Sequence, residues 1–345
     1  MAISISTDYF SRSTTEHLKG YLALGVLLHH LCQHTNIINH ESILGFFMQS
    51  LGYCCVSLFF FISGYGLSVS FNKHSGGGYL INYQRNRVLP IFAVNALLVL
   101  MYATLKLLLH YEVTVSNFVL SFFYGGDIVE YGWYLPCIML FYEVFYFSAK
   151  YCGRHIPEAV LGTTVLYMAL CLLFNMPSFW YMSSLAFPCG VLFARYKPSI
   201  DIVIIPHYAL WLSLIVVLYL GCFALLYMVS VGIMPDIIPG VRLSLTSALG
   251  LLFSIMTVCA LMATAPYLKR ETFVSRHLCA IYLEIYVMQG FAFMLLRNER
   301  FSLDNDCLFI VSSIVLTLTF AALIHPVFKK LMNLVKVQNN NAKPV

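Results

Sequence analysis

Lys19 carries a cation and His30 a titratable ring, and their spacing fits a reactive site on one face of a helix. They lie eleven positions apart in an apolar stretch, which is about three turns, or roughly 16 Å, of α-helix. Both side chains therefore share one face, with His34 one turn further along it and His29 about 100° away. Because imidazole titrates near neutral pH, His30 is a candidate general base for a hydroxyl. A structural histidine bonded to a neighbouring helix is the alternative.

Glu143 and Glu284 are the carboxylates inside apolar stretches. An ionisable group within a membrane span is costly unless it is paired or lines a wet cavity. Either carboxylate could hold the His30 imidazole in its productive tautomer or balance a buried cation, and a structural ion pair is an equal alternative for Glu143. We expect Glu284 to be catalytic with His30, and we expect Glu143, His34 and Tyr282 to be candidate contacts of the acceptor.

Arg85 and Arg87 lie just before Pro90, which suits the first turn of a helix. Guanidinium groups favour phosphate, so both arginines, together with Lys19, are candidate ligands of a phosphorylated donor; simple charge bias at a membrane face is the alternative. Trp133 begins a later apolar stretch. It fits an aromatic belt at the membrane interface, or a platform on which a sugar stacks.

The composition indicates a membrane protein. Apolar residues make up 60% of the chain and charged residues 10%, and the mean hydropathy is +0.80. A soluble domain carries about 25% charged residues, so these 345 residues cannot form a water-soluble surface. The eleven cysteines have no spacing typical of a zinc site, and we expect no metal.

About ten segments have the length and apolarity that cross a bilayer. They are 18–33, 47–71, 88–109, 133–149, 158–174, 179–194, 206–230, 241–264, 278–296 and 307–328. The segment 111–124 is either a loop or an interfacial helix. Since no connecting segment is long enough for a second domain, the sequence predicts an all-α polytopic fold, with one membrane-embedded domain over 1–345.

Basic residues are distributed unevenly between the two sides of this arrangement. With an inner N-terminus, 16 of the 20 Lys and Arg are cytoplasmic: Arg12, Lys19, Lys73, Arg85, Arg87, Lys150, Arg154, Arg195, Lys197, Lys269, Arg270, Arg276, Lys329, Lys330, Lys336 and Lys343. Lysine and arginine concentrate on the cytoplasmic side of membrane proteins. We therefore expect both termini in the cytoplasm.

Four stretches resemble the membrane acyltransferase-3 family, the polytopic O-acyltransferases of bacterial surface and secreted glycans. HLKGYLALGVLLHHL carries a basic residue and a histidine with ten residues between them, Lys19 and His30. GYCCVSLFFFISGYGLS is similar to the family's second span, and its small residues form an edge that lets another helix approach closely. YQRNRVLPIF and LCAIYLEIYVMQ resemble the basic stretch before the third span and the Tyr-rich late span.

The chain departs from the family pattern at three positions. Gln84 replaces the first of two arginines that the family places before its third span, Ile138 replaces a frequent acidic residue, and Gln289 replaces a late histidine. We therefore expect the phosphate contacts to be rearranged around Arg85 and Arg87.

The resemblance implies acyl transfer, and we expect the group to be acetyl. Acetyl-CoA, or another acyl-CoA, would be the cytoplasmic co-substrate, a glycan or its precursor would be the acceptor, and no cofactor would be bound permanently. The lipid bilayer is a further expected partner, and nucleic acid is not. The expected location is the plasma (inner) membrane.

Two rival functions belong to other classes. A proton-coupled transporter or flippase of a small polar solute could use the same buried histidine and glutamate as a relay. The chain has no visible inverted repeat, which argues against many transporter folds. A scaffold without chemistry would leave the shared face of Lys19 and His30 unexplained.

Overall fold

The computed structural model describes residues 8–74, 77–123, 128–234, 240–268 and 273–336. These residues form helices and connecting turns, and no strand beyond an isolated bridge is found among them. The all-α prediction is confirmed. Three predicted inner basic residues, Lys269, Arg270 and Lys343, lie outside the described residues.

The chain divides into two compact units. Unit 1 comprises residues 1–69 and 157–286, and unit 2 comprises residues 70–156 and 287–345. The long helix α2 (Ile43–Lys73) gives its last turn to unit 2, and α12 (Tyr282–Leu296) gives its first residues to unit 1. The single domain over 1–345 stays a prediction.

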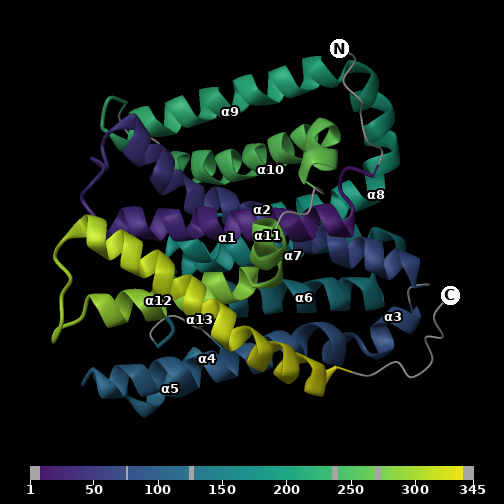
Figure 1. Ribbon diagram of the computed structural model, residues 1–345. Coiled ribbons are helices and arrows are strands. Elements are labelled where there is room, and N and C mark those ends of the chain that lie inside the picture. The colour runs from purple at the N-terminus through teal and green to yellow at the C-terminus, as the bar shows by residue number, and fades with distance from the viewer. Residues whose placement is uncertain (1–7, 75–76, 124–127, 235–239, 269–272, 337–345) are drawn as a thin grey trace. The chain divides into compact units, whose positions relative to one another are not determined.

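The helices of unit 1 come from two separate parts of the chain and can be followed in Figure 1 by their labels. They are α1 (Arg12–His34), most of α2, α7 (Ile156–Leu173), α8 (Ala186–Ile204), α9 (Tyr208–Ser230), α10 (Val241–Leu268) and α11 (Phe273–Ala280), with short 3-10 turns at η3 (Ser178–Trp180) and η4 (Ile205–His207). α9 lies along α10, and α1 packs against α11.

Unit 2 contains α3 (Gly77–Ile81), η1 (Gln84–Val88), α4 (Leu89–Leu108), α5 (Val115–Ser121), α6 (Tyr134–Tyr151), η2 (Gly153–His155) and α13 (Asp306–Val335). α13 packs against α4. The buried Tyr102 of α4 donates a hydrogen bond from its hydroxyl to the carbonyl of Val287 on α12, 2.7 Å away. Lys106 lies 3.7 Å from the carboxylate of Glu130, so this cation inside a predicted span has a partner.

Each predicted span contains a helix, and six helices of the described part are long and apolar enough to cross a membrane. They are Ile43–Lys73, Gln84–Leu108, Gly153–Leu173, Ala186–Ser230, Val241–Leu268 and Asp306–Val335. The 45-residue Ala186–Ser230 contains both α8 and α9. The chain is thus a multi-pass membrane protein, whereas the count of ten spans and the cytoplasmic termini stay predictions.

The sixth predicted span is displaced in the structure. Residues 178–185 form the turn η3 and a following irregular segment, and the helix begins only at Ala186. It then continues through Lys197 and Pro198 to Ile204. An ion pair of 2.6 Å between Lys197 and Asp201, one helical turn apart, accompanies this polar extension. Apolarity had marked a stretch that is largely buried within the protein, while the helix itself runs into polar sequence.

Glycines bring α2 and α8 into backbone contact within unit 1. A Cβ added at Gly64 would overlap the backbone carbonyl of Phe187, and one added at Gly190 would overlap that of Phe61. Each helix thus places a glycine against a carbonyl of the other. The predicted small-residue edge of the second span is confirmed at Gly64 as a helix-packing surface.

Candidate active site

α1 is one unbroken helix from Arg12 to His34, as the spacing of Lys19 and His30 requires. Ser11 precedes it and accepts a hydrogen bond on its hydroxyl from the backbone N–H of Thr14, which satisfies one of the donors exposed at a helix start. His30 is buried, Lys19 is half-buried, and His34 is exposed at the last turn.

His30 has a hydrogen bond that favours one placement of the ring proton. Its Nδ1 lies 3.0 Å from the side-chain oxygen Oε1 of Gln33, one turn along the same helix. An amide oxygen only accepts hydrogen bonds, so Nδ1 is the donor and the neutral ring has its lone pair on Nε2. This is the tautomer of a base that works through Nε2.

His29 has a structural position on the same helix. Its Nδ1 donates to the backbone carbonyl of Met48 on α2, 3.3 Å away. Its ring occupies the space that a side chain at Gly52 would fill. His29 and His30 lie with ring centroids 4.8 Å apart, and the alternative of a histidine satisfied by a neighbouring helix applies to His29.

Lys19 contacts the start of α12. Its ammonium lies 5.3 Å from the ring centroid of Tyr282, and that ring stacks on Phe59 of α2 at 6.2 Å. The neighbouring Gly20 lets α1 approach α11 closely, because a Cβ there would meet the backbone of Leu278 on α11. The structure therefore brings together two predicted site residues, Lys19 and Tyr282, within unit 1.

Glu284 is buried in the first turn of α12, with 2% of its surface exposed. It is a candidate carboxylate held away from solvent on the segment that contacts Lys19. Its predicted support of His30 stays a prediction.

Arg85 and Arg87 lie in η1, a wide π-helical turn that leads directly into α4. Arg87 donates to the hydroxyl of Ser70 at 3.3 Å and lies over the ring of Tyr79 at 5.6 Å. Arg85 is exposed, and its guanidinium makes no ion pair or hydrogen bond within the described ranges of the chain. π-turns are often found at functional sites, and here the turn presents one anchored and one available guanidinium.

Glu143 of α6 accepts a hydrogen bond from the side-chain amide of Gln84 at 2.8 Å. The neighbouring Tyr83 donates from its hydroxyl to the carbonyl of Tyr142 at 2.9 Å. Both contacts fasten η1 to α6 within unit 2. Gln84, which replaces an expected arginine, is thus bound to the carboxylate of Glu143. The predicted contact of Glu143 with the acceptor stays a prediction.

Trp133 precedes α6 and packs edge-on against Tyr134, with ring centroids 6.3 Å apart. The ring is half-buried. Both roles suggested for Trp133, in an interfacial belt or as a sugar platform, fit this partial exposure. His34 is exposed, which fits its predicted contact with the acceptor.

A family model described as an acyltransferase domain matches residues 15–325. The chain belongs to the acyltransferase-3 family. The matched range contains every predicted site residue, from Lys19 to Glu284. The comparisons with curated proteins and with solved structures return no match. Membership in the acyltransferase-3 family makes this multi-pass membrane protein an acyltransferase, and the resemblance inferred from the four stretches is confirmed.

Gln33 is the residue that sequence reasoning missed. Its position three residues after His30 could have indicated the contact, since side chains three residues apart are neighbours on a helix. The sequence pattern gave no indication of the contacts of Arg87, by contrast, because Ser70 and Tyr79 lie on other elements. Gln33 thus lies within hydrogen-bond distance of His30, the predicted base, on the same helix.

Proposed function

We propose that the protein transfers an acyl group, acetyl in the simplest case, from acyl-CoA to a hydroxyl of a cell-surface or secreted glycan or its precursor. The observation that carries this proposal is the buried His30, whose Nδ1–H is held by Gln33 so that Nε2 keeps its lone pair. Family membership supplies the acyltransferase class. Donor, acceptor and the bacterial plasma membrane belong to the proposal.

In the proposed reaction, Nε2 of His30 takes the proton of the acceptor hydroxyl as its oxygen attacks the thioester carbonyl carbon. The new C–O bond forms, the C–S bond breaks, and the thiolate of CoA takes the proton from the imidazolium. The products are the ester and the free thiol. Exclusion of water by the membrane body protects the thioester from hydrolysis, and Glu284 would stabilise the transient positive charge on the ring.

Lys19, Arg85 and Arg87 are the proposed donor contacts. Arg85 suits phosphate because it is exposed and has a planar array of donors. Acceptor contacts are proposed for Tyr282, Trp133, Glu143 and His34. The test of the function is incubation of membranes that contain the protein with labelled acetyl-CoA and candidate glycans. Label in the glycan is expected, and a transporter would leave the glycan unlabelled.

Arg85→Ala is expected to raise KM for acyl-CoA by roughly 10-fold or more and to leave kcat nearly unchanged. A charge-assisted hydrogen bond contributes about 1.5–3 kcal/mol, and a contact with remote phosphates acts equally on substrate and transition state. Steady-state kinetics in detergent measure both constants. Arg12→Ala is the control, because Arg12 is exposed and forms only a local pair with Glu16. Equal KM values for the two variants would refute a donor contact at Arg85.

Gln33→Leu is expected to lower kcat about 10-fold with little change in KM, since the ring loses the acceptor that fixes its tautomer. Gln33→Glu keeps an acceptor of the same reach and is expected to recover much of the rate. Nitrogen chemical shifts of labelled histidine report the proton position on His30 directly. A wild-type tautomer ratio in Gln33→Leu would show that Gln33 does not orient the ring.

A further inference from the structure

The end of α13 forms a basic hollow of about 590 Å³, lined by Pro326, Lys329, Lys330, Asn333, Leu334 and Lys336. Three lysines and one amide thus border this open hollow, and its remaining lining is apolar. No acidic side chain lines it among the residues that the structure describes. Such a space favours a ligand that has an anionic group and an adjoining apolar part.

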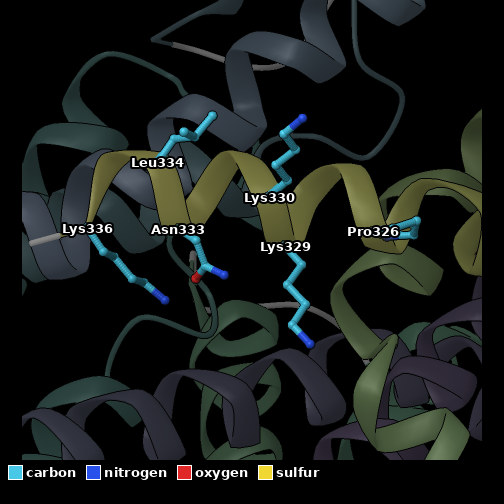
Figure 2. A pocket seen from close by; sticks show the side chains of 6 residues that line it. All are labelled: Pro326, Lys329, Lys330, Asn333, Leu334 and Lys336. Atoms are coloured by element: carbon cyan, nitrogen blue, oxygen red, sulfur yellow. The ribbon is translucent and has the colours of Figure 1, made fainter. Parts of the chain in front are cut away.

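Three of the polar groups share a direction. Figure 2 shows Lys329, Asn333 and Lys336 extending from one side of α13, while Lys330 and Leu334 extend from the opposite side. Their spacing of four and three residues places them one above the other along the helix. The ammonium groups of Lys329 and Lys336 therefore flank the amide of Asn333.

These lysines, like Arg85, have no acidic partner among the described residues, whereas several other basic residues do. Lys106 pairs with Glu130, Lys197 with Asp201 and Arg297 with Asp306. In the described part of the chain, the ammonium groups of Lys329, Lys330 and Lys336 form no ion pair or hydrogen bond.

The helix itself offers little compensation for this positive charge. The single acidic residue of α13 is Asp306, in its first turn, which lies roughly 35 Å along the helix from Lys329. The carbonyls at a helix end amount to about half a negative charge, which leaves most of the charge of three ammonium groups uncompensated.

The position on α13 indicates which anion fits. The apolar sequence of this membrane-crossing helix gives way to Lys329 and Lys330 directly after Phe328. Basic clusters next to a membrane span attract the headgroups of anionic lipids. Pro326 and Leu334 add apolar surface beside the lysines, as a ligand embedded at a bilayer interface requires.

We propose that the basic hollow binds the phosphate group of an anionic phospholipid, with Lys329 and Lys336 as cationic contacts and Asn333 as an amide donor between them. The hollow begins at Pro326, just after the family match ends at residue 325. It is therefore a feature of this chain outside the part that the family model describes, and it does not depend on the proposed acyl transfer.

The test measures lipid binding by the full chain in neutral detergent. Phosphatidylglycerol is added and counted by native mass spectrometry, with phosphatidylcholine as the uncharged reference. We expect wild-type protein to prefer phosphatidylglycerol. Lys329→Gln with Lys336→Gln should weaken that binding by about 5-fold per lysine, or about 25-fold together, and added salt should weaken it in the wild type.

The matched control is Lys73→Gln with Lys150→Gln, which removes two exposed ammonium groups elsewhere. An equal loss in both double variants would overturn the proposal, since net charge alone would then explain binding. It is also overturned if wild-type protein has no preference for phosphatidylglycerol. Unchanged lipid binding together with a raised KM for acyl-CoA in Lys329→Gln with Lys336→Gln would overturn the lipid assignment in favour of donor phosphates.

Discussion

His30→Ala is expected to reduce acyl transfer by about 10²–10⁴-fold, the contribution that a positioned general base makes. The residual rate would come from binding and from exclusion of water. The substitution removes the ring whose Nδ1 bonds Gln33 and leaves a small cavity on the buried face of α1. The measurement is transfer of labelled acetyl from acetyl-CoA, with thermal unfolding of the purified variant to show that it folds.

His207→Ala is the control for this experiment, because His207 is an exposed histidine of unit 1 outside the site. It should keep wild-type activity. If folded His30→Ala protein transfers acetyl as fast as this control, His30 is not the base and the proposed mechanism fails. Full loss of activity in a folded variant, with acyl-CoA still bound, would support a chemical role for the ring.

Gly64→Ala is expected to lower the free energy of unfolding by about 2 kcal/mol or more, the range that overpacking of an interior produces. The added methyl group would overlap the backbone carbonyl of Phe187. A carbonyl cannot rotate away as a side chain can, so α2 and α8 must separate. Gly190→Ala should behave alike, since it would meet the carbonyl of Phe61. Thermal unfolding in detergent measures both changes.

Gly66→Ala is a closely matched control, because Gly66 lies in the same helix and a Cβ there would have no neighbour within 4 Å. It should be neutral or slightly stabilising, as alanine favours helix more than glycine does. Equal unfolding temperatures for Gly64→Ala and Gly66→Ala would contradict the proposed contact. A stability loss confined to Gly64 would show that this part of the second-span motif serves packing.

The elements carrying the site were predictable because they follow from local spacing. Apolar runs of bilayer length located the helices, and the eleven-residue interval was enough to place Lys19 and His30 on one helix. The small-residue edge around Gly64 was predictable for the same reason, since glycine in an apolar helix permits close approach.

The partners of the site residues were not predictable, because they come from segments far apart in the chain. Glu143 receives the amide of Gln84 from 59 residues away, and Lys19 lies over the ring of Tyr282. Hydropathy also misplaced the sixth span, since the α8 helix continues past Arg195 into polar sequence. Apolarity reports exclusion from water, whereas helix ends depend on capping and on short-range ion pairs.

The wide turn η1 affects what happens when the basic stretch before Pro90 loses one residue. A π-turn holds one residue more than the α-helical turn it replaces. Deleting a single residue from Gln84–Val88 would restore ordinary winding and leave the residues before it facing nearly the same way, because the wide turn already absorbs the extra residue. Homologous proteins with a stretch one residue shorter would then hold their guanidinium groups in the same place at a position one residue closer to the proline, so counting back from Pro90 does not by itself identify equivalent arginines.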